Sequence, residues 1–389
     1  MKILFISAYL PGRGLHGGSS RIFELLHYLH RHHEITLLCF KNRLDDDSRL
    51  KDLRSMCKKI SVFLTREKLP FYPFPFEPFM AYSQDDFRKK LQKLVQREKF
   101  DLVQYEYVQM GIYHKDLAHI PSVLTEHEVN FLALQRSLPF VKGPLKKLKD
   151  YYDSLQMMKR ELDVLNQMDR VICMNRHDAN ALVGYVPQEK LEILPHGVDT
   201  AYFAPMSDVT PEPNAIGYFG AFQHYPNVDA VHYFVHDIFP LVKERIPDAH
   251  FYVIGSNPPE EIRQLHGRTD ITVTGFVPDI RPYMARCAVI VAPIRLGLGM
   301  RVKVVEAMAM GKPVVATELA CEGIDVTDGV DAAMANTEES FAESVCYMLQ
   351  DHACASAMGA AARKLVERNF EYRAIGERLD RIYRSVTNR

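Results

Sequence analysis

Residues 292–316 read Ala292-Pro-Ile-Arg-Leu-Gly-Leu-Gly-Met-Arg-Val-Lys-Val-Val-Glu-Ala-Met-Ala-Met-Gly-Lys-Pro-Val-Val-Ala316, a pattern that predicts a strand, a glycine loop, a helix and a second strand. The apolar run that ends at Ala292 predicts a buried strand. Gly297 and Gly299 then let the backbone approach a ligand. A helix is expected from about Met300, with Gly311 as its C-terminal cap. This succession is typical of a doubly wound α/β sheet.

The start of this expected helix carries two cations, Arg301 and Lys303. A helix N-terminus presents unpaired N–H groups and the positive end of its dipole, so cations there are unfavourable for the isolated helix. A bound anion such as a diphosphate would remove the conflict. In the alternative interpretation both side chains are solvated, and Lys303 merely pairs with Glu306.

Length and composition limit the function classes. A chain of 389 residues predicts two domains rather than one core. Its 48 basic and 49 acidic residues give no field that would attract nucleic acid, so no nucleic-acid partner is expected. No apolar run reaches the ~18 residues that span a bilayer, and the N-terminus does not resemble a secretory signal, so a cytoplasmic location is expected. Seven cysteines without a C-x-x-C pair predict reduced core thiols and no metal site.

The first half of the chain opens with a βαβ pattern. Lys2–Ser7 predicts a strand, residues 20–31 have helical apolar spacing, and residues 34–40 predict a second strand. The loop that contains Gly17 and Gly18 does not match G-x-G-x-x-G. A close backbone approach to a ligand is therefore expected here rather than a dinucleotide site.

A later strand, at residues 122–125, delivers Glu126, His127 and Glu128 to its carboxyl end. In an open α/β sheet this edge is where ligands bind. A histidine between two carboxylates is expected to have its protonated form favoured. Three exposed loop residues would give the same sequence, so both interpretations stay open.

Two segments have features of lipid contact. Residues 69–80 hold four prolines among aromatic residues, which predicts an extended loop that either meets a lipid-linked substrate or packs onto its own domain. Residues 140–165 predict a long polar helix whose start is rich in lysine. Its basic face either lies against anionic lipid or is simply solvated. The first alternative would place the protein on the inner face of the cytoplasmic membrane.

The second half of the chain repeats the strand and helix alternation. It begins with the predicted strand 215–219, which ends at Gly220. Residues 205–213 are poor in large apolar side chains and are the expected interdomain linker. The sequence therefore predicts an α/β protein of two doubly wound, Rossmann-like domains that face each other across a cleft.

Several motifs together resemble the group-1, family-four class of retaining glycosyltransferases with the GT-B fold. They are Gly17-Gly18, Pro195-His-Gly-Val-Asp199 where the family usually has P-N-G-V-D, Gly220, Gly275-Phe276-Val277, and the loop and helix up to Glu306. The resemblance implies an acceptor-side domain at residues 1–200 and a nucleotide-sugar domain at 201–370. It also implies a hinge at His196 and Gly197, and a C-terminal helix at 371–389 that crosses back to the first domain.

The resemblance also implies roles for single residues. Glu306 matches the acidic residue that accepts hydrogen bonds from the nucleotide ribose, and His127 matches the histidine near the donor sugar. Leu298 stands where the E-x7-E motif has its first acidic residue, so that carboxylate is absent. The donor-binding set implied in this way is Gly17, Gly18, Gly220, Phe276, Val277, Leu298, Gly299, Met300 and Glu306.

The arginine and lysine that the family usually carries after Gly220 are also missing. Arg301 and Lys303 occupy positions that the common family pattern fills with uncharged residues. We infer that the compensating charge has been relocated to Arg301 and Lys303. With His127, which the resemblance places near the donor sugar, they are the candidate catalytic residues.

The implied reaction moves a sugar from a nucleoside diphosphate to a hydroxyl of a carbohydrate or lipid-linked acceptor, with retention, in polysaccharide or glycolipid synthesis. UDP is favoured over GDP as the donor nucleotide, and neither a cofactor nor a metal is expected. Two alternatives remain open: an enzyme of the same fold such as a nucleotide-sugar epimerase, and a catalytically inactive GT-B scaffold that binds nucleotide.

Overall fold

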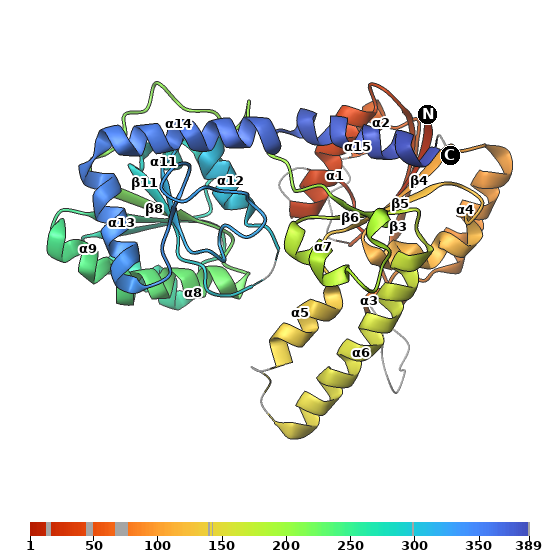
Figure 1. Ribbon diagram of the computed structural model, residues 1–389, viewed down its shortest axis with the longest axis horizontal. Coiled ribbons are helices and arrows are strands. Elements are labelled where there is room, and N and C mark those ends of the chain that lie inside the picture. The colour runs from red at the N-terminus through yellow and green to blue at the C-terminus, as the bar shows by residue number, and fades with distance from the viewer. Residues whose placement is uncertain are drawn as a thin grey trace. The chain divides into compact units, whose positions relative to one another are not determined.

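The computed structural model describes residues 1–12, 17–43, 50–66, 77–138, 141, 143–297 and 299–387. The chain forms two compact units, one made of Met1–Pro195 with Ile375–Arg389 and the other of His196–Ala374. Each unit is a parallel sheet with helices packed against it (Figure 1). The predicted architecture of two Rossmann-like α/β units is therefore confirmed.

The first unit contains a seven-stranded parallel sheet in the order β3-β2-β1-β4-β5-β6-β7. Its strands are β1 (Lys2–Ser7), β2 (Glu34–Lys41), β3 (Lys59–Leu64), β4 (Leu102–Glu106), β5 (Ser122–Glu126), β6 (Arg170–Cys173) and β7 (Leu191–Ile193). Its helices are α1 (Gly17–Leu29), α2 (Leu50–Met56), α3 (Glu77–Met80), α4 (Asp85–Arg97), α5 (Asn130–Ser137), α6 (Pro144–Gln167) and α7 (Arg176–Leu182), with 3-10 helices at Val108–Asp116 and Gln188–Lys190.

Two apolar cores cover the two faces of this sheet, because successive strand residues point to opposite sides. Ile3 and Phe5 of β1 face a core that also contains α1 and α2, whereas Leu4 and Ile6 face a core built with α4 and α6. The C-terminal helix α15 (Tyr372–Thr387) contributes Ile375, Leu379, Ile382, Tyr383 and Val386 to the first of these cores.

The second unit contains a six-stranded parallel sheet in the order β10-β9-β8-β11-β12-β13. Its strands are β8 (Ala215–Phe219), β9 (His250–Ile254), β10 (Ile271–Gly275), β11 (Val289–Ala292), β12 (Val314–Ala316) and β13 (Ala333–Met334). Its helices are α8 (Tyr225–Tyr233), α9 (Phe239–Arg245), α10 (Glu260–Arg263), α11 (Arg281–Arg286), α12 (Val302–Ala309), α13 (Glu338–Gln350) and α14 (His352–Asn369), with a π-helical turn at Phe234–Ile238 and a 3-10 helix at Gln264–Gly267.

The segment 205–213 is not a free linker, contrary to the expectation from its polar composition. It lies inside the second unit, and the chain passes between the units at Pro195 and again at Ala374. Glu212 binds this segment to the sheet, because its carboxylate accepts hydrogen bonds from Arg286 Nη2 at 2.5 Å and from Tyr252 Oη at 2.6 Å. Polar side chains here supply ion pairs, which composition cannot distinguish from solvation.

Other expectations have mixed outcomes. All seven cysteines are free and six of them are buried, as the sequence predicts. The proline-rich stretch was expected to stay extended up to residue 80, but Glu77–Met80 is a short helix, and residues 67–76 lie outside the described residues. None of the helices in the described ranges is both long enough and apolar enough to pass through a bilayer.

Candidate functional site

The order of each sheet reverses at one place, and the site residues gather on the loops there. The reversal lies between β1 and β4 in the first unit and between β8 and β11 in the second. Loops at the carboxyl ends of strands beside such a reversal are the usual ligand sites of α/β sheets. Gly18 follows β1, Gly220 follows β8, and the glycine loop with Gly299 follows β11.

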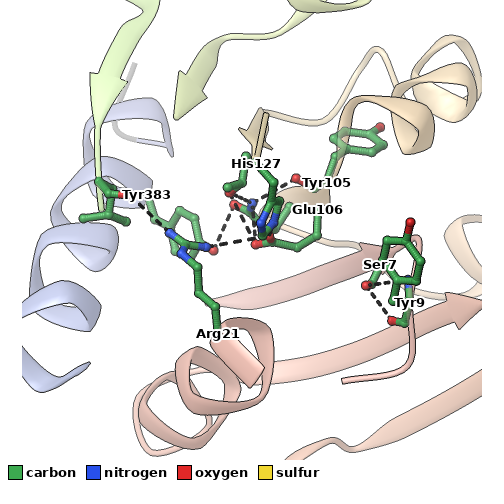
Figure 2. A network of polar contacts seen from close by, with 10 residues as sticks. Ser7, Tyr9, Arg21, Tyr105, Glu106, His127 and Tyr383 are labelled. Carbon is green, nitrogen blue, oxygen red and sulfur yellow. Dashed lines mark hydrogen bonds and ion pairs between the residues drawn. The ribbon is translucent and has the colours of Figure 1, made fainter. Parts of the chain in front are cut away.

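In the first unit, His127 follows β5, and its side chain contacts Glu106 at the end of β4 (Figure 2). Its Nε2 lies 2.7 Å from Oε2 of Glu106, the last residue of β4. Its ring stacks on Tyr107 with centroids 3.9 Å apart and an angle of 10°. At Gly18 an added Cβ would lie 1.7 Å from Tyr107 Oη and 3.3 Å from His127 Nδ1. Only glycine therefore lets α1 begin so close to this pair of rings.

The electrostatics of His127 differ from the sequence-based expectation. Burial lowers the pKa of His127, and the Glu106 carboxylate beside it raises the pKa by less. The neutral ring is therefore favoured, whereas the sequence had indicated the protonated one. A carboxylate can only accept a hydrogen bond, so Nε2 carries the proton and Nδ1 keeps its lone pair towards the start of α1.

The carboxylate next to His127 was also assigned to the wrong residues. It belongs to Glu106 and not to Glu126 or Glu128, which flank the histidine in sequence. Glu126 is fully enclosed by protein, and burial raises the pKa of its carboxyl group well above the usual value. Neighbouring residues of an extended segment point in opposite directions, so sequence adjacency did not bring these groups together.

Glu106 is the centre of a buried polar network that extends to the C-terminal helix (Figure 2). Arg21 Nη1 lies 3.8 Å from Glu106 Oε2, and both side chains are 0% exposed. Gln104 Nε2 donates to Glu106 Oε1 at 3.1 Å, and Tyr383 Oη on α15 donates to Gln104 Oε1 at 3.0 Å. The position of His127 thus depends on groups from β4, α1 and α15.

In the second unit, Lys303 extends from the first turn of α12 to the loop after β8. Its ammonium donates to Tyr218 Oη at 3.0 Å and to Asn227 Oδ1 at 2.5 Å. An added Cβ on Gly220 would lie 2.5 Å from Lys303 Nζ. The cation on α12 therefore stands at the loop after Gly220, where the sequence lacks the usual basic residues.

Arg301 holds the glycine loop itself. It is the N-terminal cap residue of α12, and its guanidinium donates to the backbone carbonyls of Gly299 and Leu296. Gly297 and Gly299 have φ angles of +98° and +75°, a region that glycine adopts without steric cost. The helix starts at Val302, slightly later than expected, because these loop residues are not helical.

Lys303 and Glu306 are both perturbed by burial. Burial lowers the pKa of Lys303 to about 7 and raises the pKa of Glu306 to about 7, while each charge partly offsets the effect on the other. The ammonium of Lys303 points to Tyr218 and Asn227, and the two charged groups form no ion pair. The alternative of a simple Lys303–Glu306 pair is therefore wrong. A cation at a helix N-terminus with no carboxylate partner in the described residues is suited to bind an anion.

Two family models match this chain. Residues 15–202 match the model described as Glycosyltransferase Family 4, and residues 213–351 match that of Glycosyl transferases group 1. The chain belongs to the group 1 glycosyltransferases. A curated relative, the UDP-Gal:alpha-D-GlcNAc-diphosphoundecaprenol alpha-1,3-galactosyltransferase of Escherichia coli, is 22% identical over 331 residues, which are 79% of this chain and 76% of the relative.

Solved structures of other proteins share the fold of this group 1 glycosyltransferase. Sucrose-phosphate synthase from Thermosynechococcus elongatus has a TM-score of 0.73 at 17% identity, with all of both chains covered. Anabaena HepE, in complex with UDP and glucose, has a TM-score of 0.68 at 16% identity, with 99% of this chain and all of the other covered. These similarities show the GT-B fold. The two family matches and the galactosyltransferase relative show that the chain is a sugar-transferring enzyme of glycan synthesis.

The other predicted site residues of the glycosyltransferase lie in varied surroundings. Phe276 is 75% exposed after β10, whereas Val277 and Met300 pack against the core of the second unit. His196 is buried, and Gly197 allows the ring of Tyr372 to pack against the backbone. Gly17 is the first residue of α1, and Leu298 lies outside the described residues.

Sequence reasoning missed several residues of this glycosyltransferase site. Glu106 ends β4, the strand beside the reversal in the first sheet, and Tyr107 follows it, a position that could have singled them out. Tyr107 has a φ of +77°, which is rare for a bulky residue and is concentrated at functional sites. Tyr218 and Asn227, which bind Lys303, carried no sequence signal. Within the described residues no three His, Cys, Asp or Glu side chains are grouped as metal ligands.

Proposed function

We propose that this glycosyltransferase moves a hexose from a UDP-sugar to a hydroxyl of a lipid-linked saccharide, with retention at the anomeric carbon. The proposal rests mainly on the ammonium of Lys303. This lysine lies in the first turn of α12, and its ammonium lies beside Gly220. The family assignment and the name of the Escherichia coli relative, a UDP-galactose-dependent enzyme with a diphosphoundecaprenol acceptor, support it. Anabaena HepE, of the same fold, binds UDP-glucose and supports UDP as the nucleotide.

The second unit would hold the diphosphate through three features. Lys303 supplies a positive charge, the N-terminus of α12 supplies the positive end of the helix dipole, and the glycine loop allows close approach. A diphosphate would also raise the pKa of Lys303 from about 7 back towards that of an ordinary lysine. Binding would then be coupled to proton uptake above neutral pH.

The transfer step is a substitution at the anomeric carbon. The bond between that carbon and the diphosphate oxygen breaks, and the acceptor hydroxyl oxygen forms the new bond to the same face of the sugar. The proton of the hydroxyl passes to an oxygen of the departing diphosphate, so UDP is released and no further reactant is needed. Lys303 and the positive end of the α12 dipole would stabilise the negative charge that develops on the leaving group.

Retention is supported by the chemistry of the relative. Galactose is α-linked in UDP-galactose, and the name of the Escherichia coli enzyme specifies an alpha-1,3 product. A lipid-linked acceptor would also place the enzyme at a membrane surface, on the inner face of the cytoplasmic membrane where nucleotide sugars are present.

GDP-sugars are the less favoured donors.

Replacing Glu306 with alanine is expected to weaken UDP binding about tenfold, because a carboxylate bonded to the ribose contributes ~1.5 kcal/mol or more. In the described residues no side chain donates to this carboxyl group, so it is available to a ligand. Isothermal titration calorimetry measures the affinity. Glu339→Ala, an exposed carboxylate of the same unit, is the control. Equal affinity of Glu306→Ala and the wild type would remove the ribose role.

The proposal is tested by incubating the protein with UDP-hexoses and a polyprenyl-diphosphate saccharide, followed by NMR of the anomeric proton of the product. We expect UDP release coupled to an α-linked product. A free, epimerised sugar would indicate an epimerase instead. A rise in melting temperature with UDP but no turnover with any donor would indicate an inactive scaffold.

A further inference from the structure

The helices α5 and α6 form a hairpin that projects away from the sheet of the first unit (Figure 1). Glu161 of α6 fixes the hairpin, because its carboxylate accepts hydrogen bonds from the backbone N–H groups of Asn130 and Phe131 at 2.9 and 3.0 Å. These are the first two residues of α5, so Glu161 caps that helix from its neighbour. These hydrogen bonds therefore fix the two helices of the hairpin to each other.

The first three turns of α6 expose large apolar side chains. Leu145 is 84% exposed and Leu148 is 67% exposed, which is unusual for leucine in a folded domain. We call the following set the apolar stripe: Leu145, Leu148, Tyr151, Tyr152 and Leu155. At ~100° per residue these positions cover an arc of ~120° and a length of ~15 Å.

The apolar stripe does not take part in packing α6 against the rest of the first unit. The buried residues of the same helix, such as Ser154, Met157 and Glu161, project from the opposite side. Beside the stripe lies a shallow hollow of about 330 Å³, lined by Leu138, Pro144, Lys147, Leu148 and Tyr151. Adjacent exposed apolar side chains with a polar rim are typical of an interaction site.

Lysines border the apolar stripe on both sides. By helical position Lys147 lies at one edge and Lys149 at the other, with Lys146 further round, and all three are exposed. Lys149 is bonded to Asp153 at 2.6 Å, whereas Lys146 and Lys147 make no ion pair within the described residues. A second copy of the chain packed on the stripe would bring like charges together. An anionic surface with an apolar interior complements both the stripe and its edges.

We propose that the tip of α6 docks on an anionic lipid membrane, with the apolar stripe inserted among the headgroups and the lysines against lipid phosphates. The inference rests on the proposed function to the extent that a lipid-linked acceptor lies in such a membrane. Because no described helix could span a bilayer, the contact is interfacial.

Co-sedimentation of the full chain with vesicles tests this docking. Binding is expected to vesicles of phosphatidylglycerol and phosphatidylcholine, with much weaker binding to phosphatidylcholine alone. The double variant Leu145→Ser, Leu148→Ser is expected to bind at least about tenfold more weakly, since apolar burial drives insertion. In the double variant Lys147→Glu, Lys149→Glu, the affinity for anionic vesicles is expected to fall at least about fivefold per lysine. The preference for anionic lipid is expected to be lost.

Matched controls separate this surface from general effects. Tyr347→Ser removes an exposed aromatic residue of the other unit, and Lys89→Glu, Lys90→Glu reverses exposed lysines of α4. Both are expected to bind like the wild type. Unchanged vesicle binding by the α6 variants would overturn the proposal, as would a stripe-dependent dimer in sedimentation velocity.

The outcome is independent of the proposed reaction. Transfer to a short-chain, water-soluble acceptor is expected to be unchanged in the α6 variants, whereas transfer to vesicle-borne acceptor falls with binding. Vesicle binding without any transfer would leave the docking surface intact and contradict the proposed function. Transfer without stripe-dependent vesicle binding would support the proposed function and contradict the docking surface.

Discussion

Replacing Lys303 with methionine is expected to lower kcat by about 10²- to 10³-fold, the usual effect of removing one charge that stabilises a leaving group. The structure gives the reason. The ammonium stands beside Gly220 and is oriented by Tyr218 and Asn227, so it is positioned before any ligand binds. Methionine matches the unbranched lysine side chain as far as Cε and lacks its ammonium group.

A second substitution tests whether the charge of Lys303 was relocated. Ala221→Arg places a cation in the loop after Gly220, where the family usually has one. Added to Lys303→Met, it is expected to raise kcat at least about tenfold, whereas Ala221→Gln added in the same way should not raise it.

Arg301→Ala is expected to lower kcat at least about tenfold by itself, because the glycine loop loses its anchor. Near-normal turnover of Lys303→Met would contradict the role assigned to this lysine.

The same lysine predicts a pH dependence of donor binding. Lys303 must be protonated to attract the diphosphate, and its pKa is about 7, so affinity is expected to fall as the pH rises above 7. Glu306 must be ionised to accept ribose hydroxyls, and its pKa is raised to about 7, so affinity falls as the pH drops below 7. Calorimetry with UDP-glucose should show a maximum near neutral pH. Lys303→Met is expected to remove the alkaline decline and Glu306→Ala the acid one.

Replacing Glu106 with glutamine is expected to destabilise the protein by about 3–5 kcal/mol and to lower kcat about 10²-fold. Its carboxylate faces the guanidinium of Arg21 in a region with no solvent exposure, so the neutral amide leaves a buried charge without its partner. The amide also offers His127 either a donor or an acceptor, so the imidazole is no longer held in one tautomer.

A double-mutant cycle and NMR separate the two effects of Glu106→Gln. Arg21→Met combined with Glu106→Gln is expected to recover most of the lost stability in urea unfolding, because both charges are then removed. The imidazole nitrogen shifts should still show a mixture of His127 tautomers, and kcat should stay low. Tyr383→Phe, which removes the hydrogen-bond donor to Gln104, is expected to change the nitrogen shifts of His127 less than Glu106→Gln does. Full recovery of kcat with stability would show that Glu106 is structural only.

Much of the architecture could be predicted because it depends on local patterns. Alternating apolar runs and helical spacing identified strands such as β1 and β11 and the helix α12, and Gly311, with a φ of +67°, ends that helix as expected. The sites on the loops followed from one rule, that ligands bind at the carboxyl ends of parallel strands. The polar segment 205–213 was misjudged because solvated and ion-paired residues have the same composition.

The sequence by itself determined the two Rossmann-like units, the glycine loop, the two cations after it and the missing carboxylate at Leu298, since each is a matter of residue type and spacing. Only the tertiary structure decided which groups act on one another. Glu106 ends β4 and His127 follows the neighbouring strand β5, and these two residues are 21 apart in sequence. Lys303 and Tyr218 are 85 apart. Burial then set the sign of the pKa shift of His127. Strand order and desolvation depend on the whole packed chain, and no local pattern contains them.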